Sequence, residues 1–129
     1  MTASLGRVVV TGKIPEPGLE LLRGADHDVI AWTDATAIPR DELLRRVAGA
    51  DVIVSLLTER IDADLLDAAG PQLRAVCNVA VGHNNIDVPA CRERGVIATN
   101  TPGVLTEDTA DMTMALILAV PRRIVDGVK

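Results

Sequence analysis

The chain has 129 residues, a net charge of −5 and 48% hydrophobic side chains, and Trp32 is its single aromatic residue. That length fits one domain with a substantial aliphatic core, together with a fragment of a second domain. The acidic balance, and the lack of aromatic side chains that stack on bases, argue against a nucleic acid or an anionic membrane as partner.

The first half of the chain alternates between short apolar runs and helical patterns. Residues 7–11 are apolar on both faces and predict a central strand, after which a helix begins near Pro15. Residues 27–33 are more mixed and predict an edge strand, followed by a helix that begins near Pro39. Residues 51–57 predict a third strand, again apolar on both faces.

The second half continues the alternation. Asp62 is predicted as the N-cap of a third helix that ends near Gly70, and residues 74–79 predict a fourth strand. Asp87 is predicted as the N-cap of the next helix. Residues 96–99 then predict a short fifth strand.

Five alternations of strand and helix, with connections too short for anything but helical crossovers, indicate a parallel sheet covered on both faces. Crossover handedness favours a flavodoxin-like, doubly wound α/β fold with the strand order 2-1-3-4-5. In such a sheet, ligands bind beyond the carboxyl ends of strands near the switch point. We therefore expect the loops after Leu57 and Val81 to face one another.

The turn after the fourth strand is the strongest candidate for a binding site. Residues 79–87 run from the strand through Gly82 and three consecutive polar residues into a helix, an arrangement that leaves backbone N–H groups unpaired. Gly82 lets the main chain approach a small anion, because no side chain stands in the way. We interpret this turn as a carboxylate cradle. Two plainer interpretations stay open: Gly82 only shapes a tight turn, and His83 points to water instead of adding a donor.

The last segment has a different pattern. Thr106 is predicted to cap a helix whose residues 112–120 are apolar almost all round, so we expect this helix to be buried on both sides. Pro121 should kink or end it. A helix that continued to the C-terminus would be about 35 Å long at 1.5 Å per residue. Such a helix is typical of a connection between two domains, and we expect it to self-associate.

Several kinds of chemistry are missing from the sequence. It contains no Gly-x-Gly dinucleotide fingerprint, no P-loop, no serine nucleophile motif and no His-x-x-His pair, so neither catalytic residues nor metal ligands are assigned. Cys77 and Cys91 are expected to be buried thiols. Residues 112–120 are too short to span a bilayer, which needs about 20 residues. Residues 1–7 lack a signal-peptide pattern, so we expect a cytoplasmic protein.

Three segments together resemble the N-terminal region of the D-isomer-specific 2-hydroxyacid dehydrogenases, especially the glyoxylate and hydroxypyruvate reductase branch. They are residues 56–62, 78–87 and 98–111. The resemblance implies that the N–H groups of Val81 and Gly82, here named the cradle amides, hold the substrate carboxylate. It further implies that Leu56 lines the substrate pocket and that Thr106 lies near the nicotinamide. Two departures are Asn84, where many members carry Asp, and Pro121, where Ala is common.

The resemblance also implies a domain division. Residues 1–100 would form the substrate-binding domain, and residues 101–129 the hinge and first helix of a cofactor-binding domain whose remainder is absent. The intact relative would use NAD or NADP to reduce a small 2-oxo acid such as glyoxylate or hydroxypyruvate, and would form a homodimer through the 106–120 helix. Because the family's glycine-rich loop and catalytic Arg, Glu and His come later in the chain, we expect this chain alone to bind no NAD(P) tightly and to be inactive. The alternative is a standalone flavodoxin-like module that binds small anions or serves in regulation.

Overall fold

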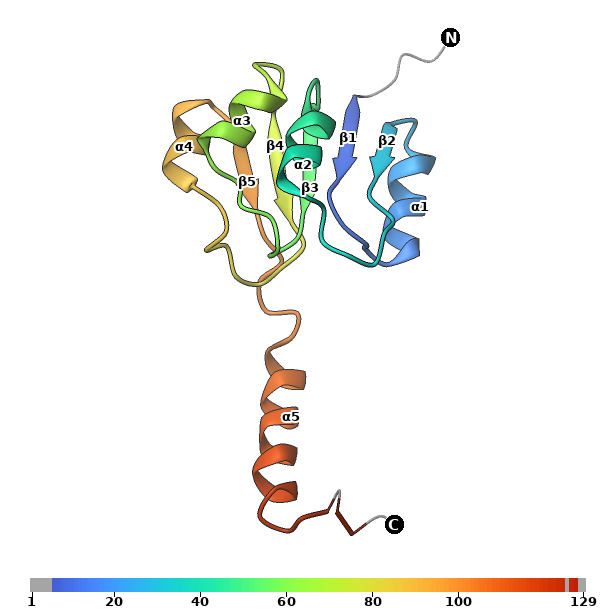
Figure 1. Cartoon of the computed structure of the whole chain (residues 1–129), viewed down its shortest axis with the longest axis vertical. Helices are drawn as coiled ribbons and strands as arrows, with labels where there is room; N and C mark the ends of the chain where they lie inside the picture. Colours follow the sequence, from blue (N-terminus) through green and yellow to red (C-terminus); the bar gives the residue numbers. More distant parts are fainter. Residues whose placement is uncertain (1–5, 125, 128–129) are drawn as a thin grey trace.

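The computed structural model describes residues 6–124 and 126–127. It contains a five-stranded, fully parallel sheet with the order β2-β1-β3-β4-β5 (Figure 1), which confirms the predicted α/β class and strand order. The strands are β1 (Arg7–Val10), β2 (Asp28–Ala31), β3 (Val52–Ser55), β4 (Ala75–Asn78) and β5 (Ile97–Thr99). The helices are α1 (Glu16–Gly24), α2 (Arg40–Val47), α3 (Ala63–Ala69), α4 (Val88–Glu93) and α5 (Thr106–Ala119).

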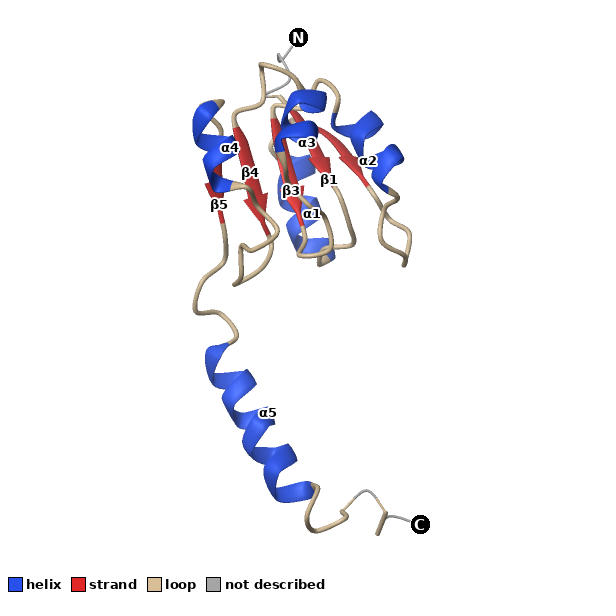
Figure 2. Cartoon of the chain, turned by 60° about the vertical axis from the view of Figure 1, so that its left-hand side comes forward, coloured by secondary structure: helices blue, strands red, loops and turns tan. Residues whose placement is uncertain are grey.

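The helices cover the two faces of the sheet unequally. Helices α2, α3 and α4 pack on one face, and α1 packs on the other (Figures 1 and 2). Successive side chains of a strand point to opposite faces, so Val9 is buried under the three-helix layer while Val8 and Val10 are buried on the α1 side. In β3, Ile53 and Val54 divide in the same way. Burial on both faces confirms β1 and β3 as inner strands.

Every strand except β5 ends earlier than the run that predicted it. The third run extends to Leu57, but β3 ends at Ser55. The N–H of Leu56 donates to the side chain of Glu59 at 2.8 Å and so leaves the ladder. A polar side chain three residues farther along therefore decides where this strand stops.

Both predicted aspartate caps are confirmed. The side chain of Asp62 accepts from the Leu65 N–H at 3.1 Å, and that of Asp87 accepts from the Ala90 N–H at 2.9 Å. Each carboxylate thereby satisfies one of the N–H groups that a helix leaves unpaired in its first turn.

Helix α5 differs from its prediction at its start. Thr106 is the first helical residue and not the cap; Leu105 occupies the cap position, and no side-chain hydrogen bond caps the helix. The predicted effect of Pro121 is confirmed, because the helix ends at Ala119. Val120 still has helical backbone angles, and its N–H donates to the Leu116 carbonyl at 3.0 Å, but Pro121 then offers no N–H to continue the pattern. Within the single chain none of the α5 residues is buried, and the helix projects away from the sheet (Figures 1 and 2). Its burial against another surface stays a prediction.

The two cysteines are both free thiols. Cys91 is buried as expected, whereas Cys77 is only half-buried. Burial, with a smaller effect of the Asp87 charge, raises the pKa of the Cys91 thiol. Residues 1–5 of the segment considered for a signal peptide lie outside the described residues. Within the described chain, no helix combines the length and the hydrophobicity needed to cross a membrane.

Candidate functional site

The carboxyl ends of the strands form one edge of the sheet, and the chain leaves this edge toward α5 (Figure 1). Here the loop after β3 lies against the turn after β4. The Ile61 N–H donates to the Asn85 carbonyl at 2.8 Å, and the Ile61 carbonyl accepts from the Asp87 N–H at 2.8 Å. The two loops thus face one another, as the sheet order predicted.

The cradle amides lie at the surface of this edge. Val81 is 42% exposed and Gly82 is also exposed. Neither N–H donates a hydrogen bond to any described residue. A Cβ placed on Gly82 would meet the Leu57 side chain at 3.8 Å, which is ordinary van der Waals contact. Two neighbouring donors are therefore open to a ligand that arrives from solvent.

The carbonyl groups of the same turn, by contrast, are occupied. The Ala80 carbonyl accepts from the Thr101 N–H at 2.9 Å. The Val81 carbonyl accepts from the side-chain amide of Asn100 at 2.8 Å. The turn is thus held by the segment that follows β5, while the two cradle amides stay free of described partners.

Two asparagines join this turn to the loop after β3. Asn78 is buried at the end of β4, and its Nδ2 donates to the Gly82 carbonyl at 3.0 Å. The Nδ2 of Asn85 donates to the carbonyls of Leu56 and Glu59, both at 3.0 Å. Both loops are therefore fixed by side-chain amides, which sequence reasoning did not identify.

Glu59 is a second organising residue that sequence reasoning missed. The residue is only 4% exposed. The carboxylate accepts from the Thr11 hydroxyl at 2.6 Å and from the Leu56 N–H at 2.8 Å, and also from the Thr58 hydroxyl. In the sequence, Glu59 is an acidic residue just after the apolar run 51–57. That position alone does not tell a buried carboxylate from one exposed to solvent.

Leu56 is held by its backbone at the crevice, but its side chain points toward β1. A Cβ on Gly12 would lie 2.4 Å from the Leu56 Cδ1, so the leucine occupies the space that this glycine leaves. Leu56 lines a hollow together with Lys13, whereas His83 and Asn100 line a different one. The Leu56 backbone therefore belongs to the hydrogen bonds from Asn85 and to Glu59 that fix the loop beside the cradle, and the Leu56 side chain does not.

Thr106 lies apart from the cradle. It starts α5, is exposed, and makes no side-chain hydrogen bond within the described residues. Helix α5, which Thr106 begins, stands away from the sheet (Figure 1).

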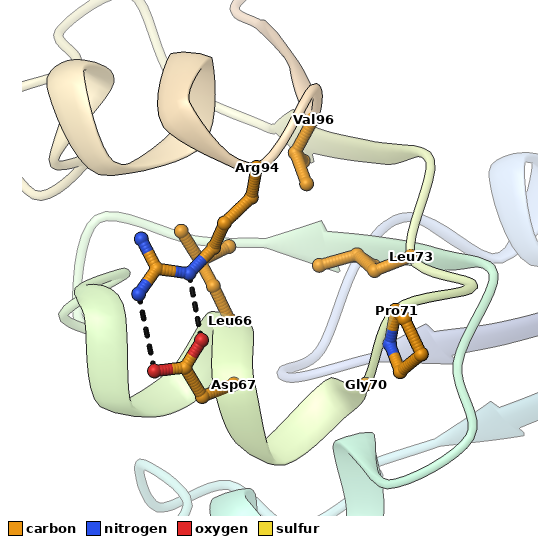
Figure 3. A pocket seen from close by; sticks show the side chains of 7 residues that line it. All are labelled: Leu66, Asp67, Gly70, Pro71, Leu73, Arg94 and Val96. Atoms are coloured by element: carbon orange, nitrogen blue, oxygen red, sulfur yellow. Dashed lines mark hydrogen bonds and ion pairs between the residues drawn. The ribbon is translucent and has the colours of Figure 1, made fainter.

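A separate cavity of about 360 Å³ opens at the opposite edge of the sheet, between α3 and α4 (Figure 3). It is lined by Leu66, Asp67, Gly70, Pro71, Leu73, Arg94 and Val96. Asp67 and Arg94 form a two-point ion pair at its rim, with N···O distances of 2.7 and 3.1 Å. The hydrogen bond from Arg94 lowers the pKa of Asp67. Leu73 and Val96 precede β4 and β5, so this cavity lies at the amino ends of the strands, away from the cradle.

The loop after β3 also carries a charged link between helices. Asp62 forms an ion pair with Arg40 at the start of α2 and a second one with Arg60. Burial alone would raise the pKa of Asp62, but the hydrogen bonds from Arg40 and from the Leu65 N–H, with the two arginine charges, lower it overall. This carboxyl group is therefore ionised, and it stabilises the loop as well as the helix.

The fold and this edge define a class of protein: a doubly wound α/β domain with two exposed main-chain N–H groups beyond its fourth strand. Comparison with known proteins narrows the class. Residues 8–122 match the model of the D-isomer specific 2-hydroxyacid dehydrogenase catalytic domain. The chain belongs to the D-isomer-specific 2-hydroxyacid dehydrogenase family.

Individual relatives agree with this assignment. A glyoxylate reductase from Thermococcus kodakarensis is 46% identical over 122 residues, which cover 94% of this chain and 36% of the relative. The crystal structure of the TT0316 protein from Thermus thermophilus matches with a TM-score of 0.88 at 44% identity, covering 94% of this chain and 38% of that one. A 2-hydroxyacid dehydrogenase from Ketogulonicigenium vulgare Y25 matches with a TM-score of 0.74 at 31% identity, covering 94% and 37%. The chain thus spans about 36% of the length of the curated relatives reported for it.

Proposed function

We propose that residues 1–100 are the substrate-binding domain of an NAD(P)-dependent D-2-hydroxyacid dehydrogenase that reduces a 2-oxo acid of the glyoxylate or hydroxypyruvate type. Residues 101–129 are, in this proposal, the hinge and the first helix of the cofactor-binding domain. The observation that carries the proposal is the pair of exposed cradle amides, which have no hydrogen-bond partner among the described residues. The glyoxylate reductases among the relatives support the substrate class.

The residues of this chain have distinct roles in the proposal. The N–H groups of Val81 and Gly82 bind the substrate carboxylate, as backbone donors in a turn bind small anions. Leu56 contributes the wall of the pocket beside β1, and Thr106 lies near the nicotinamide. A nicotinamide, when bound, supplies or accepts a hydride. In this proposal the present chain positions the 2-oxo or 2-hydroxy acid that takes up or gives the hydride.

We propose further that the chain alone has no dehydrogenase activity and binds NAD(P) weakly at most. The lack of a Gly-x-Gly fingerprint in the 129 residues and the isolation of Thr106 support this. The purified chain should oxidise no NADH or NADPH in the presence of glyoxylate. A clear oxidation rate above the glyoxylate-free control would contradict the proposal.

Helix α5 also belongs to the proposal, as the contact between two subunits. Its apolar side chains are exposed on all sides, which favours association with a second copy. A homodimer through residues 106–120 would cover them.

Binding to the cradle is tested with glycolate, the 2-hydroxy acid that corresponds to glyoxylate and an unreactive probe. Titration into ¹⁵N-labelled chain at constant ionic strength should shift the amide resonances of Val81 and Gly82 in a saturable manner. Gly82→Ala adds a methyl group that the fold accommodates, so its sheet resonances should be retained and its glycolate affinity lost. Gly24→Ala is the matched control, because a Cβ at Gly24 meets no atom within 4 Å. Unsaturable shifts, or equal affinity in Gly82→Ala, would refute the cradle.

A further inference from the structure

The orientation of the cradle amides follows from the partners of two carbonyl groups. The Ala80 carbonyl is bound by the Thr101 N–H at 2.9 Å, and the Val81 carbonyl by the Asn100 side chain at 2.8 Å. Both carbonyls therefore face the segment directly after β5. The described peptide bonds are all trans, and the C=O and N–H of a trans peptide point to opposite sides of the chain.

Each of these carbonyls shares its peptide plane with one cradle amide. The Ala80 C=O is paired in this way with the Val81 N–H, and the Val81 C=O with the Gly82 N–H. Both N–H groups consequently point away from residues 100–101. In an extended strand, successive N–H groups alternate in direction, whereas two that point the same way form a concavity suited to an anion. The segment after β5 thus imposes the geometry that an anion site requires.

We propose that Asn100 is a positioning residue for the anion site: by holding the Val81 carbonyl, its side-chain amide aims the Gly82 N–H at the bound carboxylate. This inference rests on the proposed function of the cradle. Asn100 is exposed, and within the described chain its side chain makes no other hydrogen bond, so it contributes little to core packing. It also immediately precedes the proposed hinge. A change of backbone conformation at the hinge would therefore alter the orientation of the cradle.

The second carbonyl bond comes from the backbone of Thr101 and survives any substitution of that side chain. Asn100 is therefore the residue at which a side-chain substitution can remove one of the two bonds. Removing its donor leaves the Val81–Gly82 peptide free to rotate, while the Ala80–Val81 peptide stays fixed. We expect binding to weaken and not to vanish.

Asn84 provides a matched control for Asn100. It is an exposed asparagine in the cradle turn itself, and no hydrogen bond of its side chain to a described residue is present. Asn100→Ala and Asn84→Ala remove the same group from two positions beside the site. Asn100→Asp and Asn84→Asp each add one negative charge there, so a purely electrostatic repulsion of the anion would affect both aspartate variants alike.

The test is the glycolate titration of ¹⁵N-labelled chain, followed at the Val81 and Gly82 resonances, with amide exchange of β1, β3 and β4 as a readout of the fold. In Asn100→Ala we expect glycolate affinity to fall about three- to tenfold, as for loss of one hydrogen bond, with sheet exchange unchanged. Asn100→Asp should lose more, because its carboxylate repels the Val81 carbonyl. The Asn84→Ala variant should retain the wild-type affinity, and Asn84→Asp should lose less than Asn100→Asp.

Each other outcome has a defined meaning. Wild-type affinity in both Asn100 variants would overturn the positioning role and leave the proposed carboxylate site standing. Equal losses at positions 84 and 100 would also overturn it, because proximity alone would then explain the effect. Loss of sheet protection in Asn100→Ala would assign Asn100 to stability instead. Failure of the wild-type chain to bind glycolate would refute the proposed carboxylate site itself, and the inference with it.

Discussion

The side chains of Asn78 and Asn85 exchange two hydrogen bonds, one from Asn78 Nδ2 to Asn85 Oδ1 at 3.1 Å and one from Asn85 Nδ2 to Asn78 Oδ1 at 3.2 Å. Asn78 ends β4, and Asn85 comes seven residues later, at the far side of the cradle turn. The pair therefore closes the turn at its base. The cradle is shaped from inside by this pair and from outside by the segment after β5.

Replacing Asn85 should destabilise the domain although the residue is not in the apolar core. Asn85→Ala removes the donor to the Leu56 and Glu59 carbonyls and the two hydrogen bonds with the Asn78 amide, which keeps its bond to the Gly82 carbonyl. Unsatisfied groups of this kind cost about 1–3 kcal/mol, and we expect a loss of about 2 kcal/mol in the free energy of unfolding. Urea denaturation followed by circular dichroism measures it. Asn84→Ala should stay within about 0.5 kcal/mol of wild type, and equal losses in the two variants would contradict the prediction.

Glu59 should tolerate an amide better than a truncation. In Glu59→Gln the remaining oxygen can still accept from the Leu56 N–H and the Thr11 hydroxyl, and the new amide can donate to Thr58. Glu59→Ala leaves all three donors without this acceptor. We expect losses of about 1 kcal/mol for Gln and about 3 kcal/mol for Ala in the free energy of unfolding. A glutamine variant as unstable as the alanine variant would show that the charge itself, and not its hydrogen bonding, is what matters.

The stability contributed by Asp62 should depend on pH in a defined direction. Its pKa is lowered in the folded state: burial opposes this shift, but the hydrogen bonds and charges of its partners outweigh burial. A lowered folded pKa contributes stability above the unfolded pKa, and that stability is lost as the pH falls through the folded value. Asp62→Asn keeps an N-cap and removes this titration. Wild type should therefore exceed Asp62→Asn by about 1 kcal/mol at neutral pH, and the difference should shrink below about pH 4.

The measurement is urea denaturation of both proteins across that pH range, taking the difference at each pH so that other carboxylates cancel. Asp64→Asn is the control, since Asp64 is exposed in the first turn of the same helix and forms no ion pair with a described residue. A difference between wild type and Asp62→Asn that grows as the pH falls would have the wrong sign.

The exposed apolar surface of α5 should make the chain self-associate. Leu118 is 63% exposed on α5, and Leu21 is 77% exposed on α1. Leu118→Glu places a charge where the second copy would pack, which opposes burial, so sedimentation velocity should show a shift toward monomer. Leu21→Glu makes the same chemical change outside α5 and should leave the association unchanged. Identical sedimentation of the two variants would argue against an α5 interface.

The sequence by itself determined the features whose causes are local. Each apolar run and each aspartate cap, such as Asp62 and Asp87, depends on side chains within a few residues of one another, and the handedness of crossovers then restricts the strand order. The exception was the start of α5, where Thr106 had the residue type of a cap but Leu105 occupies the position.

Only the tertiary structure decided how the candidate site is supported. Asn100 reaches a carbonyl 19 residues away, and the Thr11 hydroxyl reaches a carboxylate 48 residues away. A polar side chain has no periodicity that identifies its partner, because the partner is whichever group the packed sheet places within hydrogen-bond distance. For the same reason the apolar pattern of residues 112–120 indicated a surface that favours burial, but it could not identify what covers that surface. The exposure of α5 in this chain depends on which other surfaces lie beside it.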